Sequence, residues 1–145
     1  MRISIASDHA AKELQQHLID YLKTFDIDVD DITNPREVDY PAIALQLCNK
    51  IKSGKSDLGV LLCGTGIGMS MAANKVSGIR AAVCSDTFSA KMCRKHNDAN
   101  VICIGARVVG FGLAEEILHG FFTSKFTGGR HARRVAAINE LDEGV

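Results

Sequence analysis

The residues with the clearest capacity for chemistry form a glycine-rich segment in the middle of the chain: Cys63, Gly64, Thr65, Gly66, Ile67 and Gly68. The three glycines allow backbone N–H groups to converge at the start of a helix and to form a cradle for an anion. A free thiol has a pKa of about 8.5, which a helix N-terminus lowers, so Cys63 is a candidate thiolate. A thiolate beside an oxyanion site suits proton abstraction next to a carbonyl, and it equally suits acyl transfer.

This segment differs from three better-known glycine-rich loops. It is not a P-loop, because no Gly-Lys-Ser/Thr follows. It is not a cysteine-phosphatase loop, because Met69 stands where an arginine would close the turn. It also misses the dinucleotide fingerprint, whose third glycine comes one residue later and which belongs on the first strand. A tight strand-to-helix turn without chemistry is the alternative interpretation.

Arginines and histidines supply further candidate groups. Arg130 and Arg134 are four residues apart at the start of the last expected helix, so both guanidinium groups can hold one phosphate. A solvated basic face is the alternative for this pair. His9, His96 and His131 each fall at a loop or helix end, and we expect them near one cleft.

The five cysteines do not follow a disulfide or zinc pattern, since their number is odd and no two are spaced as C-x-x-C. Cys48, Cys84 and Cys103 lie in apolar stretches and are expected to be buried, inert thiols. Cys63 is the exception, and we expect its sulfur to be open to a substrate.

The elements that must position these groups alternate along the chain. Apolar runs predict strands over residues 3–6, 27–32, 58–63, 79–84 and 101–104. Helical spacing predicts helices over residues 9–24, 40–53, 67–76, 88–96, 111–124 and 131–141. This alternation predicts an α/β fold, a three-layer α/β/α sandwich with a parallel sheet of about five strands.

Polar groups recur where these strands end. The strand ends are followed by Ser7-Asp8-His9, by the Cys63 segment, by Cys84-Ser85-Asp86 and by Gly105-Ala106-Arg107, and the fourth helix closes with His96-Asn97. Right-handed crossovers bring the carboxyl ends of parallel strands to one edge, where ligands bind. We therefore expect the functional site at this edge, with His96 in it.

Composition excludes several functions. Lys+Arg and Asp+Glu balance at 17 each, which gives no reason to expect nucleic acid or a membrane surface as partner. No apolar run reaches the roughly 18 to 20 residues that span a bilayer. The first residues do not resemble a signal peptide. We expect one cytoplasmic domain over residues 1–145.

The segment CGTGIGMSMAANK at residues 63–75 resembles the ribose-5-phosphate isomerase B family, which also contains galactose-6-phosphate isomerase subunits. The resemblance continues over nearly the whole chain, in SDHAA (7–11), DYP (39–41), IRAAVCSD (79–86), RKHNDANV (94–101), GARVVG (105–110) and GGRHARRV (128–135). It implies a Rossmann-like sheet, no metal or organic cofactor, a phosphorylated sugar as substrate, and a homodimer or tetramer whose subunits share each active site.

The resemblance also implies residue roles. Cys63 would be the base that moves a proton between C1 and C2 of the open-chain sugar, and His96 would assist ring opening. Thr65 would move a proton between the two sugar oxygens, while the amides of residues 64–68 hold the enediolate. The remaining substrate contacts would come from Asp8, His9 and Asn97 for hydroxyls or the ring oxygen, from Arg130, Arg134 and a neighbouring subunit's Arg107 for the phosphate, and from Tyr40, packed against the sugar.

Three functions follow as hypotheses. The first is interconversion of ribose 5-phosphate and ribulose 5-phosphate through a cis-enediolate, a reaction of the pentose phosphate pathway. One branch of the family has a glutamate base at the position of Met69 and lacks the cysteine, so this chain resembles the cysteine branch. The second hypothesis is isomerisation of a phosphorylated hexose, allose 6-phosphate or galactose 6-phosphate. The third is a nucleotide- or phosphate-binding module in which Asp86, about 20 residues beyond Gly64, binds a ribose.

Overall fold

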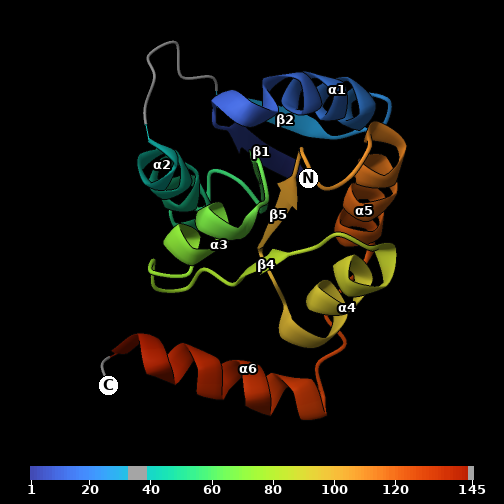
Figure 1. Ribbon diagram of the computed structural model, residues 1–145. Coiled ribbons are helices and arrows are strands. Elements are labelled where there is room, and N and C mark those ends of the chain that lie inside the picture. The colour runs from blue at the N-terminus through green and yellow to red at the C-terminus, as the bar shows by residue number, and fades with distance from the viewer. Residues whose placement is uncertain (33–38, 144–145) are drawn as a thin grey trace.

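The computed structural model describes residues 1–32 and 39–143, in which strands and helices alternate (Figure 1). The strands are β1 (Arg2–Ser7), β2 (Asp28–Ile32), β3 (Leu58–Cys63), β4 (Ala81–Val83) and β5 (Val101–Gly105). The α-helices are α1 (Lys12–Lys23), α2 (Tyr40–Lys52), α3 (Ile67–Ala73), α4 (Thr87–Asn97), α5 (Phe111–Thr123) and α6 (Arg130–Glu140), with short 3-10 turns η1 (His9–Ala11) and η2 (Leu141–Glu143). Within the described ranges, no helix combines the length and apolar character needed to cross a membrane.

Every strand expected from the sequence is present, and most boundaries agree within one or two residues. The fourth strand is the shortest, because the Arg80 amide donates to the side-chain oxygen of Asn100 (2.9 Å) and so does not enter the ladder. The first helix begins as η1, where the Asp8 carboxylate accepts a hydrogen bond from the Ala10 amide (2.9 Å). The three-layer α/β prediction is confirmed.

The sheet is entirely parallel and has the strand order β2-β1-β3-β5-β4. From β1 the chain passes to β2 on one side, and it then crosses back to β3 on the other side. The carboxyl ends of β1 and β3 therefore form a topological switch point, the place where open α/β sheets bind ligands. Ser7 is paired with Leu62 there, directly before the Cys63 segment.

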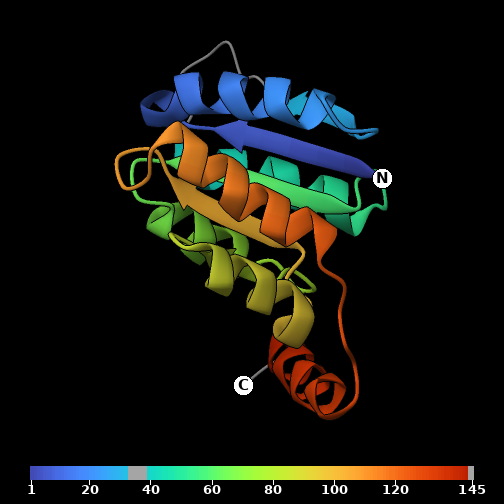
Figure 2. The ribbon, with the colours of Figure 1, turned by 90° about the vertical axis from the view of Figure 1, so that its right-hand side faces the viewer.

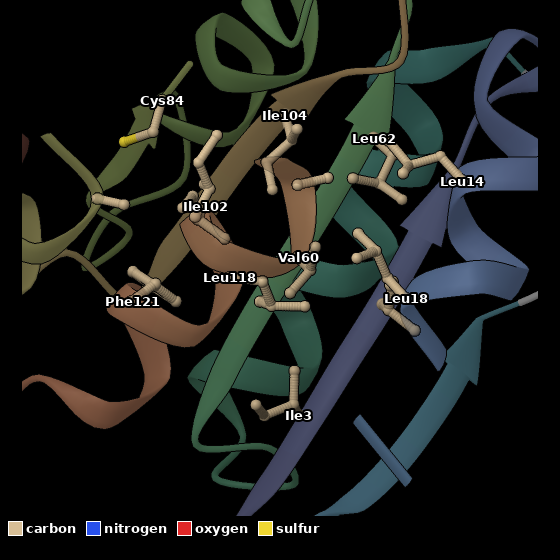
Figure 3. Packing of buried hydrophobic residues seen from close by; sticks show 14 of the residues in the cluster. Ile3, Leu14, Leu18, Val60, Leu62, Cys84, Ile102, Ile104, Leu118 and Phe121 are labelled. Carbon is tan, nitrogen blue, oxygen red and sulfur yellow. The ribbon is translucent and has the colours of Figure 1, made fainter. Parts of the chain in front are cut away.

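Alternating side chains of the strands divide the core into two layers. One layer contains Val60 and Leu62 of β3 under helices α1, α4 and α5, and Figure 3 shows this packing. The other contains Leu61 and Cys63 under α2 and α3. The period-2 alternation of a strand thus places the Cys63 side chain on the face covered by α3, the helix that follows the glycine turn.

Helix α6 stands apart from these layers, as the red helix at the bottom of Figure 2. It buries only Val135, so its own apolar packing is small. Polar contacts attach it at both ends. Thr127 donates two hydrogen bonds to the Lys95 carbonyl of α4 (3.0 and 2.8 Å), and Asn139 accepts one from Arg80 (3.1 Å).

Candidate active site

The glycine turn after β3 is shaped by close backbone contacts. Gly66 has a φ of +80°, a left-handed conformation that favours glycine. A Cβ on Gly66 would lie 3.2 Å from backbone atoms of Cys103 and Ile104 in β5. The Gly66 amide points at Cys63 and donates a hydrogen bond to its Sγ (3.1 Å). The expected donor beside the sulfur is therefore present.

The Cys63 sulfur is less open than the sequence suggested. The residue is only 6% exposed and packs in the α2/α3 layer, where Met69 is a fully buried neighbour. The reason is its position at the end of a central strand, paired with Gly105 of β5 on one side. Thr65, in contrast, is exposed, and its Oγ1 accepts a hydrogen bond from the Ile67 amide (3.3 Å).

Arg107 lies beside the glycine turn of its own chain. Its amide donates to the Gly64 carbonyl (3.0 Å), and the neighbouring Ala106 amide donates to the Cys63 carbonyl (2.8 Å). A Cβ on Gly64 would lie 3.4 Å from an Arg107 guanidinium nitrogen, so the side chain also follows the turn. The sequence predicted that Arg107 and the pair Arg130 and Arg134 belong to different subunits. Since Arg107 lies at the Cys63 turn of its own chain, this prediction requires Arg130 and Arg134 to come from the partner subunit.

Tyr40 approaches the same turn from α2. A Cβ on Gly68 would lie 2.9 Å from two atoms of the Tyr40 ring, so only glycine allows this ring to lie so close to the start of α3. The residue is 43% exposed, so a ligand can reach it. Tyr40 thus lies at the carboxyl edge beside the glycine turn, and its contact with a sugar remains a prediction.

Asp8 and His9 complete a set of residues at the carboxyl edge, which we call the carboxyl-edge group: Asp8, His9, Tyr40, Cys63, Thr65 and Arg107. The Asp8 amide donates to the Leu62 carbonyl (3.1 Å), which fixes the end of β1 against β3. His9 is exposed and lines a cavity of about 390 Å³ that also contacts Lys12 and Ala106. Asp8, His9, Cys63, Thr65, Tyr40 and Arg107 therefore surround the switch point.

His96 and Asn97 do not join this group, and the prediction that they share its edge is wrong within one chain. Helix α4 begins at the carboxyl edge after β4 and runs back antiparallel to the strands. Its last residues lie at the amino edge, where the Asn97 carbonyl accepts a hydrogen bond from Arg80 (3.1 Å), the residue before β4. The two edges are separated along β5 by roughly 13 Å, at about 3.3 Å per residue.

The His96 side chain meets α6 instead. Its ring stacks on His131, with centroids 4.2 Å apart and an interplanar angle of 7°. Burial, together with electrostatic interactions with His96, Arg130 and Arg134, lowers the pKa of His131. These residues therefore form a second, basic group, made by the end of α4 and the start of α6.

Comparison with known proteins identifies the chain. The family model described as Ribose/Galactose Isomerase matches residues 3–138. The chain belongs to this family. It is an isomerase of the ribose-5-phosphate isomerase B type that acts on sugar phosphates, as its resemblance predicted.

Three relatives show the range of the family. D-erythrulose-4-phosphate isomerase of Pectobacterium atrosepticum is 46% identical, over 95% of this chain and 93% of the relative. The structure of Clostridium thermocellum ribose-5-phosphate isomerase B is 46% identical, with a TM-score of 0.95 over 99% of this chain and 98% of that one. Mycoplasma genitalium ribose-5-phosphate isomerase B with bound ribulose-5-phosphate is 37% identical, with a TM-score of 0.93 over 99% and 97%.

Gly105 has a role in the site that the sequence did not reveal, and Asp86 has a different role from the one it suggested. A Cβ on Gly105 would lie 2.7 to 2.8 Å from backbone atoms of Thr65, so only glycine allows β5 to end against the turn. Asp86 is the N-cap of α4, and its carboxylate accepts a hydrogen bond from the Ser89 amide (2.7 Å). This capping role accounts for the carboxylate of Asp86 at the start of α4. The ribose contact that the binding-module hypothesis gave to Asp86 is not needed to explain its position.

Proposed function

We propose that the protein interconverts ribose 5-phosphate and ribulose 5-phosphate, with Cys63 as the base. The observation that carries the proposal is the contact between the Cys63 sulfur and the Gly66 amide, at the switch point of a sheet in a sugar-phosphate isomerase. The Gly66 amide is a main-chain donor at the sulfur, and an exposed hydroxyl, that of Thr65, lies two residues along the turn.

The active site forms between two subunits. One subunit contributes the carboxyl-edge group with Cys63, and the other contributes the group with His96, Arg130 and Arg134. The position of these groups at opposite edges of one sheet supports this arrangement, because a single chain cannot close both on one sugar of this size. In a dimer with twofold symmetry each contact occurs twice, so two such composite sites arise.

Each reacting group then has one task. His96 helps to open the sugar ring, and Arg130 and Arg134 hold the phosphate with charge-assisted hydrogen bonds, aided by Arg107 across the interface. The Cys63 thiolate removes the proton from C2 of the aldose, and the electron pair forms the C1–C2 double bond of the enediolate. Thr65 moves a proton between O2 and O1, and the Cys63 thiol returns its proton to C1, leaving the ketone at C2.

Turnover in deuterated water tests this mechanism. During the lifetime of the enediolate, the Cys63 thiol exchanges its proton with solvent. Ribose 5-phosphate formed from ribulose 5-phosphate therefore carries deuterium at C2. Cys63→Ala abolishes both turnover and exchange but keeps affinity for the sugar phosphate. Arg134→Ala instead weakens binding, by about 1.5 to 3 kcal/mol for a lost charge-assisted contact. Isomerisation by Cys63→Ala at the wild-type rate would remove Cys63 from the mechanism.

The length of the sugar is a separate question. A tetrose phosphate is a second candidate, because a relative named for erythrulose 4-phosphate is as similar as the ribose-5-phosphate isomerase from Clostridium. The phosphorylated hexoses, allose 6-phosphate and galactose 6-phosphate, are the longer alternatives. Comparison of kcat/KM for these substrates with that for ribose 5-phosphate decides among them, and a clear preference for another length would overturn the pentose assignment.

A further inference from the structure

Helix α6 carries both phosphate arginines of the proposed mechanism, but little packing fixes the direction of its axis. It buries only Val135. A cavity of about 410 Å³ lies where the end of α6 meets β4 and α4, and its lining includes Ala82, Cys93 and Leu141. Helices in proteins are usually held by an apolar face packed on their neighbours. The direction of α6 therefore depends on polar contacts at its two ends.

The segment before β4 makes the polar contacts at the far end of α6. The Arg80 guanidinium donates a hydrogen bond to the side-chain oxygen of Asn139 on α6 (3.1 Å). The Gly78 amide donates one to the carboxylate of Asp142 in η2 (2.8 Å). We call these four residues, Gly78, Arg80, Asn139 and Asp142, the α6 anchor. Asn139 lies five residues beyond Arg134, roughly 7.5 Å along the helix at about 1.5 Å per residue.

Arg80 is itself fixed at the end of α4. Its Nε and Nη2 donate hydrogen bonds to the carbonyl oxygens of Asn97 (3.1 Å) and Asp98 (3.1 and 2.9 Å). Nη2 also donates to the Asp98 carboxylate (3.0 Å), which accepts a further hydrogen bond from Arg94 (2.8 Å). The Arg80 side chain is only 16% exposed. One guanidinium therefore connects α6 to the residues that directly follow His96.

We propose that the residues of the α6 anchor are positioning residues of the isomerase. They fix the direction of α6, so that Arg130 and Arg134 meet the phosphate of the same sugar whose ring His96 opens. This inference rests on the proposed function, in which those three side chains bind one substrate. The near end of α6 is held by the hydrogen bonds of Thr127 to Lys95, so without the anchor the helix pivots there. The second arginine lies farther from this pivot than the first and moves more.

Steady-state kinetics of the full chain with ribose 5-phosphate test the proposal. Asn139→Ala/Asp142→Ala removes both hydrogen bonds at exposed positions. KM should rise about tenfold, as for a weakened charge-assisted phosphate contact, while kcat and the urea midpoint stay close to the wild-type values. Asn139→Asp/Asp142→Asn keeps both acceptors and the net charge, and should restore the wild-type KM. Asn49→Ala/Asp26→Ala is the matched control, because it makes the same two chemical changes at exposed positions on α2 and before β2.

A double-mutant cycle separates this inference from the proposed function on which it rests. If the anchor acts through Arg134, its removal should raise KM by a smaller factor in the Arg134→Ala chain than in the wild-type chain. A raised KM in Arg134→Ala beside a wild-type KM in Asn139→Ala/Asp142→Ala would overturn the anchor alone. So would the same fold increase in both chains, or a fall in kcat and urea midpoint without a rise in KM. An unchanged KM in Arg134→Ala would instead refute the phosphate-binding role in the proposed function, and the anchor with it.

Discussion

The imidazole rings of His96 and His131 lie face to face, 4.2 Å apart between centroids. The stack joins the last turn of α4 to the first turn of α6, a helix that buries only one apolar residue of its own. Thr127 supports the same junction through its hydrogen bonds to Lys95. The position of the arginines on α6 therefore depends on a contact between two titratable rings.

Acid should weaken this junction. Burial and the surrounding positive charges lower the pKa of His131, so the folded chain binds a proton there less readily than the unfolded chain. The contribution of His131 to stability is complete above the unfolded pKa of about 6.5 and is lost as the pH falls below it and through the lower pKa of the folded chain. The urea midpoint should therefore drop between about pH 7.5 and 5.5. In His131→Phe, which keeps a ring but cannot titrate, the urea midpoint should drop less over the same pH range. An equal or larger drop than in the wild type would contradict the role of His131.

Gly105 should control the catalytic turn without touching the sugar. Gly105→Ala places a methyl group 2.7 Å from the carbonyl carbon of Thr65, and the turn that carries Thr65 must move away. A misplacement of this kind costs about 100-fold in kcat. Steady-state kinetics with ribose 5-phosphate measure it, and a urea titration verifies folding. Gly112→Ala is the matched control, because nothing lies within 4 Å of its added methyl. If folded Gly105→Ala had the wild-type kcat, the close approach of Gly105 to Thr65 would not be needed for catalysis, which contradicts the prediction.

Asp86 should act on helix α4 and not on a ligand. Asp86→Ala removes the hydrogen bond to the Ser89 amide, so the urea midpoint falls, while Asp86→Ser, another capping residue, restores most of it. The kcat for ribose 5-phosphate per folded molecule stays close to the wild-type value in both variants. If Asp86→Ala instead kept the wild-type urea midpoint and lost affinity for a nucleotide, that result would support the binding-module hypothesis.

Much of the fold was predictable because its signals are local. Alternation of apolar runs with helical patterns gave the order of elements, and Gly66 marked a turn that only glycine adopts easily. Cys63 was recognisable as the last residue of a strand before that turn. These inferences need only the sequence neighbours of each residue and the rule that parallel strands end at one edge.

The division of the site into two groups was harder to see. His96 follows the end of β4 (Val83) by thirteen residues, and helix α4, which lies between them, carries it back to the opposite edge. The topology of a βα unit predicts this separation, because only the first turn of the helix lies at the carboxyl edge of the sheet and its last turn lies at the amino edge. The approach of Gly105 to Thr65 and the burial of Cys63 arise from contacts between strands distant in sequence, which local patterns do not report.

The central claim is that Cys63 and His96 act together from different subunits. Cys63→Ala and His96→Ala, each inactive alone, are co-expressed with different tags, and the heterodimer is purified through both. One of its composite sites carries both substitutions, and the other is wild type. The matched control pairs Cys63→Ala with Arg107→Ala, two substitutions in the same carboxyl-edge group.

We predict that the Cys63→Ala/His96→Ala heterodimer turns over ribose 5-phosphate at about half the wild-type rate per dimer, because one of two sites is intact. The Cys63→Ala/Arg107→Ala heterodimer should have no wild-type site, since each carboxyl-edge group is damaged. An inactive first heterodimer would contradict the shared site, and a half-active second one would place Arg107 across the interface from Cys63.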